Sequence, residues 1–132
     1  MNKAPVRVLV VDDEERLRRS LVSFMEDEGF QVFSASSGEE ALAMLPDTPV
    51  DVGIIDMRLT GMDGNDFIVA AHQAIPTMRF LIFTGSSDYR IPAVLRAIGI
   101  DQEHLFRKPL PDMGVLAEAV RREYRAGIGG CE

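Results

Sequence analysis

The stretch VLVVDDEERL, at residues 8–17, runs an aliphatic segment straight into a group of acidic residues. A short aliphatic run of this kind is typical of a buried β-strand. The acids that follow, Asp12, Asp13, Glu14 and Glu15, repel one another unless something compensates their charge. Carboxylates are favourable near a helix N-terminus, so a helix start explains them simply. A cation site explains them more specifically, and the rest of the chain has to decide between the two interpretations.

The composition is that of a globular protein with one domain. The chain has 132 residues, of which 46% are hydrophobic and 27% are charged. Its net charge of −7 argues against a nucleic-acid-binding surface, which is usually basic. No apolar run approaches the ~18 residues of a membrane span, and the N-terminus lacks a signal-peptide cleavage site. The lone cysteine, Cys131, gives no internal disulfide. We therefore expect a cytoplasmic domain that contacts neither nucleic acid nor membrane directly.

Short apolar runs alternate with segments of helical spacing along the whole chain. The predicted strands are residues 6–11, 31–35, 50–55, 80–83 and 105–107. The predicted helices are a first one that carries Leu17 and closes at Gly29, and four more at about 37–45, 65–75, 87–98 and 112–125. This alternation is typical of the α/β class, with a parallel sheet covered by helices on both faces. We expect residues 1–126 to form this domain and residues 127–132 to form a flexible C-terminal tail.

Polar or charged residues follow four of the predicted strands. They are Asp12 with Asp13, Asp56, Thr84 with Gly85, and Lys108 with Pro109. In an open parallel sheet the carboxyl ends of the strands meet at one edge, where ligands bind. We therefore expect these residues to converge, with Gly85 leaving room for a ligand to approach the backbone.

The converging residues suit a divalent cation and a phosphoryl group. The carboxylates of Asp12, Asp13 and Asp56 offer the hard oxygen ligands that Mg²⁺ prefers. Lys108 supplies a mobile ammonium for a phosphoryl oxygen, and Thr84 supplies a hydroxyl donor. Asp56 could be the nucleophile, because aspartyl phosphates are established covalent intermediates. The residues alone do not separate such a site from an acidic cluster with a lysine salt bridge.

Four segments together resemble the receiver domain of response regulators in two-component signalling, of the chemotaxis-regulator type. They are VLVVDDEERLRRSL, DVGIIDMRLTGMDG, IFTGSSD and FRKPL, in the family's order within residues 6–125. No single segment is specific, whereas the ordered set is. The resemblance implies a flavodoxin-like fold, in which a doubly wound five-stranded parallel sheet of order 2-1-3-4-5 is flanked by five helices.

The resemblance also implies a phosphoacceptor and a metal site. Asp56 corresponds to the aspartate that takes the phosphoryl group. Asp12, Asp13 and Asp56, together with the backbone carbonyl of Arg58, correspond to the ligands of Mg²⁺. Under this interpretation Asp12 and Asp13 serve the cation, while the two glutamates that follow them start a helix.

Further residues correspond to the family's switch. Thr84, followed by Gly85, corresponds to the switch hydroxyl, and Lys108 to the lysine that contacts the phosphoryl group. The bond between Lys108 and Pro109 corresponds to a peptide bond that is usually cis in the family.

The chain departs from the family pattern at three places, one of which is the segment GIDQEHLFRKP before the fifth strand, about two residues longer than usual. Thr60 stands where proline is common. Leu105 stands at the aromatic switch position three residues before the lysine, and the neighbouring Phe106 should point to the other face of its strand. The switch position is therefore open between Leu105 and Phe106, with His104 as a further candidate if the register shifts.

The resemblance implies a phosphoacceptor domain that catalyses its own phosphorylation and dephosphorylation and is not a turnover enzyme. Its donor would be a histidine kinase or a histidine phosphotransfer protein, and its output a downstream effector or a fused domain. A homodimer is left open. The alternative is a receiver-like docking or dimerisation module that works without phosphorylation. A flavodoxin-like cofactor binder fits less well, since the acidic segment after the first strand would repel a phosphate.

Overall fold

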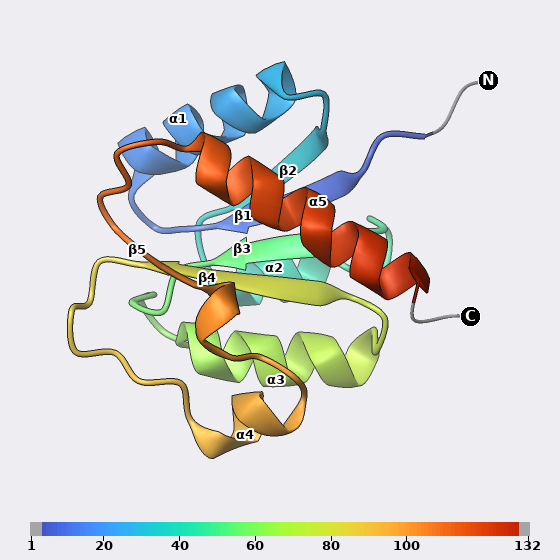
Figure 1. The fold of residues 1–132 in the computed structure, drawn as a ribbon. Coiled ribbons are helices and arrows are strands. Elements are labelled where there is room, and N and C mark those ends of the chain that lie inside the picture. Colours follow the sequence, from blue (N-terminus) through green and yellow to red (C-terminus); the bar gives the residue numbers. More distant parts are fainter. Residues whose placement is uncertain (1–3, 130–132) are drawn as a thin grey trace.

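The computed structural model describes residues 4–129, with residues 128 and 129 described by their backbone alone. The chain forms one five-stranded sheet of order β2-β1-β3-β4-β5, in which every neighbouring pair is parallel (Figure 1). The strands are β1 (Arg7–Val11), β2 (Gln31–Ala35), β3 (Val52–Ile55), β4 (Arg79–Thr84) and β5 (Leu105–Arg107). The helices are α1 (Glu15–Asp27), α2 (Gly38–Met44), α3 (Gly64–Ala74), α4 (Ala93–Ala97) and α5 (Gly114–Gly129), with a short 3₁₀ helix, η1 (Gln102–His104), before β5. The predicted fold class and strand order are confirmed.

The helices cover both faces of the sheet. Figure 1 shows α1 and α5 on one face, and α2, α3 and α4 on the other. Two apolar clusters fill the spaces between these layers, one with Phe67, Ile68 and Leu95 from the α3–α4 side and one with Leu21 and Leu116 from the α1–α5 side. A parallel sheet needs this double cover, because its strands are buried on both faces.

The central strands are apolar throughout because they lie between the two helical layers. All four residues of β3 are buried, and only the first residue of β1 is partly exposed. Fully burying an aliphatic side chain stabilises a fold by about 1.5–3 kcal/mol, so these strands anchor the sheet. Their carboxyl ends deliver Asp12 and Asp56 to the same edge.

The predicted helix at 87–98 is wrong in its first half. The observed α4 covers only Ala93–Ala97, and Pro92 is its extended N-cap residue. Proline restricts the preceding residue to extended conformations, so Ile91 cannot continue a helix into Pro92. Residues 85–92 form a loop instead.

The last helix is longer than predicted. It begins at Gly114, where the backbone N–H donates to Asp112 Oδ1 at 2.8 Å, and it continues to Gly129. The first residues of the predicted tail are therefore helical, while residues 130–132, with Cys131, lie outside the described residues. Among the helices within residues 4–129, none combines the length and the apolar character needed to span a bilayer.

Candidate functional site

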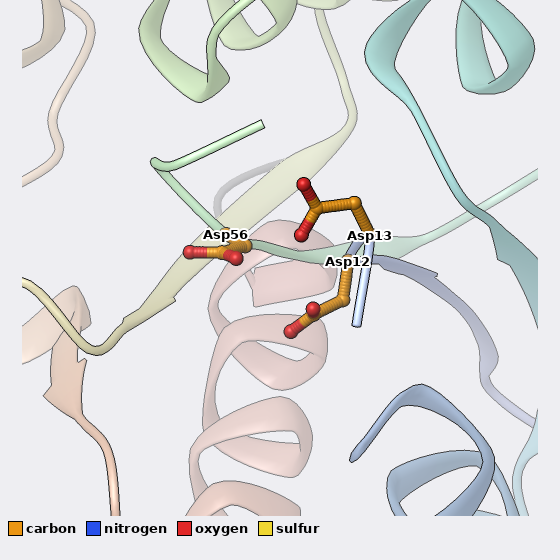
Figure 2. A group of neighbouring side chains, drawn as sticks. All are labelled: Asp12, Asp13 and Asp56. Atoms are coloured by element: carbon orange, nitrogen blue, oxygen red, sulfur yellow. The ribbon is translucent and has the colours of Figure 1, made fainter. Parts of the chain in front are cut away.

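Three carboxylates meet at the carboxyl edge of the sheet. Asp12 and Asp13 follow β1 and Asp56 follows β3, and one oxygen from each lies within 4.8 Å of the others (Figure 2). Asp12 and Asp56 are buried, with 3% and 5% of their surface exposed, whereas Asp13 is exposed. Two buried acids and one exposed acid thus line a common space that opens to solvent on the side of Asp13.

The carboxylate of Asp12 is held on both oxygens. Its Oδ1 accepts from the backbone N–H of Glu14 at 2.9 Å, and its Oδ2 accepts from Lys108 Nζ at 2.8 Å. The guanidinium of Arg18 donates to the backbone carbonyl oxygen of Asp12 at 2.8 Å and so fixes the backbone of this residue. A buried carboxylate with this many partners stays in one orientation.

Asp56 is held less tightly. Its Oδ1 accepts from the backbone N–H of Arg58 at 3.2 Å, and its Oδ2 lies 3.4 Å from Lys108 Nζ. Burial raises the pKa of Asp56 above its ordinary value, and the nearby charge of Asp12 adds to the rise, whereas Arg58 and Lys108 act in the opposite direction. The ionised carboxylate is therefore not fully compensated by its surroundings.

Lys108 is the cation between these two buried acids. Its ammonium contacts Asp12 and Asp56 together, and its side chain is 14% exposed. The ammonium also lies 5.5 Å from the centre of the Phe83 ring. Lys108 contacts two of the three carboxylates, so its single positive charge cannot balance the cluster. The Lys108–Pro109 peptide bond is cis.

Thr84 lies at the end of β4 next to this cluster. Its side chain is fully buried, and its Oγ1 accepts from the backbone N–H of Ser86 at 3.2 Å. The carbonyl oxygen of Thr84 accepts from the N–H of Lys108 at 2.8 Å, which ties the two strand ends together. Since a hydroxyl has one proton and two lone pairs, the Thr84 proton is left to be donated.

That Gly85 leaves room for a ligand stays a prediction, because the structure itself does not require a glycine there. A Cβ at this position would meet Lys108 Cδ at 3.9 Å, which is an ordinary contact. Gly64 is the glycine that close contacts require, since a Cβ there would lie 2.4 Å from the Asp56 carbonyl oxygen and 2.5 Å from Met57 Cε. The turn Met62-Asp63-Gly64 in the sequence was the available signal for this position.

Arg58 and Thr60 make contacts with the acidic cluster that the sequence did not predict. Arg58 supplies a backbone N–H to Asp56, and the role of its carbonyl as a metal ligand stays a prediction. Thr60 Oγ1 donates to Asp13 Oδ2 at 3.3 Å, so the residue that stands in place of proline contacts the exposed acid of the cluster.

Leu105 and Phe106 point to opposite faces, as predicted. Leu105 pairs with Ile82 and contacts the apolar cluster on the α3–α4 side. Phe106 pairs with Phe83 and contacts the cluster on the α1–α5 side. A switch role for either residue stays a prediction.

The sequence analysis missed the contacts that hold the loop after β4. The guanidinium of Arg107 donates to the carbonyl oxygens of Ser86 and Tyr89, the latter at 3.1 Å. Tyr89 Oη donates to Asn65 Oδ1 at 2.7 Å, and burial, with the charge of Asp63, raises the pKa of Tyr89 to about 12. No spacing rule could find these pairs, because the loop was predicted to be helical from residue 87.

Comparison with known proteins gives one family. A model of the response regulator receiver domain matches residues 8–121. The chain is 35% identical over 121 residues to the alginate biosynthesis transcriptional regulatory protein AlgB of Pseudomonas aeruginosa, with 90% of this chain and 26% of that protein covered. It is 35% identical over 136 residues to the hydrogenase transcriptional regulatory protein HoxA of Cupriavidus necator, with 98% and 27% covered. The chain thus spans about a quarter of the length of these curated relatives.

Solved structures agree on the fold. A CheY-like receiver domain protein from Methanospirillum hungatei superposes with a TM-score of 0.86 at 24% identity, covering 96% of this chain and 99% of that one. The response regulator TrrA of Thermotoga maritima, solved in complex with Mg²⁺ and BeF, has a TM-score of 0.77 at 25% identity, covering 89% and 98%. A response regulator receiver protein from Pseudomonas putida has a TM-score of 0.79 at 26% identity, covering 92% and 99%.

Proposed function

The chain belongs to the response regulator receiver domain family, and from this premise we propose that it accepts a phosphoryl group on Asp56. The donor would be a phosphohistidine on a histidine kinase or on a histidine phosphotransfer protein. The observation that carries the proposal is the placement of Asp56 beside Asp12, Asp13 and Lys108, with Thr84 at the neighbouring strand end. A purely structural salt bridge would need one acid for one lysine, whereas Lys108 contacts both Asp12 and Asp56, and a third acid, Asp13, lies beside them.

The reaction is a transfer of a phosphoryl group between two nucleophiles. An oxygen of the Asp56 carboxylate attacks the phosphorus atom, the phosphorus–nitrogen bond breaks, and the histidine nitrogen keeps the electron pair. Charge develops on the three equatorial oxygens in this transition state, so positioned cationic and hydroxyl donors accelerate the reaction. Lys108 can contact an incoming phosphoryl oxygen, because its ammonium is already within 3.4 Å of the attacking carboxylate.

The donor set fits a magnesium ion. Asp12, Asp13 and Asp56 offer oxygen ligands within 4.8 Å of one another, and histidine or cysteine is absent from this group. Mg²⁺ prefers a few carboxylates together with water and phosphate oxygens. When bound, the ion would neutralise the excess negative charge of the cluster and polarise the phosphoryl oxygens. The Thermotoga maritima relative was solved with Mg²⁺ and BeF, which supports the same assignment.

Phosphorylation would act as a switch. It adds a charge of about −1.5 to −2 and three acceptor oxygens at a buried edge. The Thr84 hydroxyl lies at the end of β4 and has a proton left to donate, so it would be drawn toward the new acceptor. The result is a shift between conformations of the neighbouring loops. The domain would catalyse its own phosphorylation and dephosphorylation without turning over a separate substrate.

The output would pass through protein contacts. The curated relatives AlgB and HoxA are named as transcriptional regulatory proteins, and each is about four times as long as the matched region. An effector or output domain, in this chain's own protein or in a partner, would therefore read the state of the receiver. A homodimer is one further arrangement that would serve this purpose.

The function can be tested with a small phosphodonor. Incubation with acetyl phosphate and Mg²⁺ should add one phosphoryl group to the intact mass of the wild type. The adduct should be absent from Asp56→Asn and after chelation of the metal. Asp47→Asn is a matched control, because Asp47 is an exposed carboxylate after α2, away from the carboxyl edge of the sheet, and should keep the adduct.

Two results would contradict the proposal. A wild-type chain that gains no adduct would favour the docking module that works without phosphorylation, for which Leu105 at the aromatic position is the supporting observation. An adduct that persists in Asp56→Asn would place the chemistry on another residue.

A further inference from the structure

The loop between β4 and α4, residues 85–92, is held by side chains from outside it. In Figure 1 it is the long connection that leaves β4 and runs around to α4. Arg107 on β5 donates a hydrogen bond from one guanidinium nitrogen to the Ser86 carbonyl oxygen and from the other, at 3.1 Å, to the Tyr89 carbonyl oxygen. Tyr89 in turn donates its hydroxyl proton to Asn65 Oδ1 at 2.7 Å. The loop is therefore tied to β5 and to the start of α3.

The first of these ties is made to Ser86, the residue that contacts the Thr84 hydroxyl. The backbone N–H of Ser86 donates to Thr84 Oγ1 at 3.2 Å, while the carbonyl of the same Ser86 accepts from Arg107. Arg107 is also the residue that pairs with Thr84 in the sheet. The side chain of Arg107 thus holds Ser86, which contacts the Thr84 hydroxyl. The backbone of Arg107 lies beside Thr84 in the sheet.

The hydrogen bond from the Ser86 N–H restricts the directions in which the Thr84 hydroxyl proton can point. A hydroxyl oxygen that accepts a hydrogen bond on one lone pair has its proton directed elsewhere. If residue 86 moved, the oxygen would lose this partner and the hydroxyl could rotate. The position of Ser86 therefore controls the donor that the phosphoryl group would meet.

We propose that Arg107 is a positioning residue for the Thr84 hydroxyl and acts through Ser86. The inference rests on the proposed phosphoacceptor function, because it concerns the donor that Thr84 offers to a phosphoryl oxygen. By holding the Ser86 and Tyr89 carbonyls, Arg107 keeps the Ser86 N–H on Thr84 Oγ1. The hydroxyl proton of Thr84 is then free to be donated to an oxygen of the phosphoryl group on Asp56.

Arginine suits this task better than lysine would. Its planar guanidinium presents several N–H groups in a fixed fork and can span two carbonyl oxygens at once. A lysine ammonium is a single flexible point charge, which can hold one carbonyl firmly but not two at a fixed separation. Both carbonyls lie in a loop outside any strand, and both accept from the exposed Arg107 side chain.

A double-mutant cycle tests whether Arg107 acts through Thr84. The full chain is compared as wild type, Arg107→Gln, Thr84→Val and the double variant, with beryllium fluoride and Mg²⁺ as the probe of the phosphoryl site. Apparent affinity is taken from the backbone amide resonances at the carboxyl edge. Arg96→Gln is the matched control, since Arg96 is another exposed arginine that donates to a carbonyl of the same loop, that of Ile91, far from Thr84.

We expect Arg107→Gln to lower the apparent affinity for beryllium fluoride at least about 3-fold in the wild-type background. In the Thr84→Val background the same substitution should have no further effect on affinity, because residues that act through one another couple. The Ser86 amide resonance should shift in both single variants, and Arg107→Lys should recover part of the affinity. Arg96→Gln should leave the affinity unchanged.

The proposal is overturned by an equal loss in the Thr84→Val background, or by no loss at all. Its failure is separable from failure of the proposed function. Acetyl phosphate labelling of the wild type tests Asp56 independently of this cycle, and a labelled wild type with an additive cycle would remove only the role of Arg107.

Discussion

Asp56 carries a charge that its surroundings only partly compensate. It shares a small space with Asp12 and Asp13, and the one lysine present lies closer to Asp12, at 2.8 Å, than to Asp56, at 3.4 Å. Burial raises the pKa of the Asp56 carboxyl, so ionising this group is harder in the folded chain than in the unfolded chain. The ionised side chain therefore destabilises the fold at neutral pH, as is common for reactive groups in functional sites.

Neutralising this residue should stabilise the protein. In the absence of Mg²⁺, Asp56→Asn should raise the free energy of unfolding by about 0.5–2 kcal/mol, measured by urea denaturation. The bond between Lys108 and Asp12 stays in place in this variant, so the change isolates the charge of Asp56. Adding Mg²⁺ should stabilise the wild type more than the variant. A variant less stable than the wild type in chelator would show that Asp56 is a structural ion-pair partner.

The site residues could be found from the sequence to the extent that they follow strands. Asp12, Asp13, Asp56, Thr84 and Lys108 all lie at or just beyond the end of a strand, and parallel strands bring such positions to one edge. The contacts of Thr60 and Arg107 could not be found in this way. They depend on the paths of loops, which no period in the sequence describes.

At the scale of elements, α4 shows where periodic patterns mislead. The apolar spacing predicts a helix from residue 87, but only Ala93–Ala97 is helical because Pro92 sets the start. The residues before it form the loop that Arg107 and Tyr89 hold. The loop beside the proposed phosphoryl site is thus fixed by a few side-chain hydrogen bonds, which are easier to rearrange than a helix.

Gly64 is the first residue of α3 and packs against the backbone of Asp56, which follows β3. A Cβ on this residue would lie 2.4 Å from the Asp56 carbonyl oxygen. Gly64→Ala should therefore lower the free energy of unfolding by about 1–3 kcal/mol through overcrowding, measured by thermal or urea denaturation. Gly127→Ala is the control, because the nearest atom to its added Cβ would lie 3.7 Å away. Equal effects of the two substitutions would show that no close contact governs Gly64.

An ion network centred on the buried His104 and Glu123 joins η1, β4 and α5. The two ring nitrogens of His104 lie 2.9 Å from Asp101 Oδ1 and 3.0 Å from Glu123 Oε2, and Arg79 contacts the same Glu123 at 3.0 Å. The imidazolium donates to both carboxylates, whereas in the neutral ring Nδ1 accepts from the backbone N–H of Asp101 at 3.1 Å. The bond to Glu123 is the main cause that raises the pKa of His104 above 6.5. Burial would raise the pKa of Glu123, but His104 and Arg79 outweigh it and lower that pKa below 4.5.

The network predicts how stability depends on pH. The contribution of His104 is complete below pH 6.5 and is lost as the pH rises through its higher folded-state pKa. The contribution of Glu123 is complete above pH 4.5 and is lost as the pH falls through its lower folded-state value. The free energy of unfolding should therefore fall as the pH is raised above 6.5, and His104→Gln should remove most of this fall. An unchanged slope in the variant would exclude His104 as its source.

For the whole molecule, the alternation of strands and helices was enough to predict the architecture. A parallel sheet with helices on both faces follows from apolar strands separated by helical segments. The order β2-β1-β3-β4-β5 came from the resemblance to receiver domains and is confirmed. The function follows from where this fold places its strand ends, because residues nearly a hundred positions apart, such as Asp12 and Lys108, meet there at 2.8 Å.

The central claim is that Asp56 itself carries the phosphoryl group. The chain is treated with acetyl phosphate and Mg²⁺, the acyl phosphate is reduced with borohydride, and the peptides are mapped by mass spectrometry. Reduction converts a phosphorylated aspartate into homoserine, so the position of the modified residue is read directly. We expect homoserine at position 56 in the treated wild type and nowhere in the sample that lacks Mg²⁺. Homoserine at another aspartate, or an unmodified Asp56 peptide after full treatment, would contradict the account.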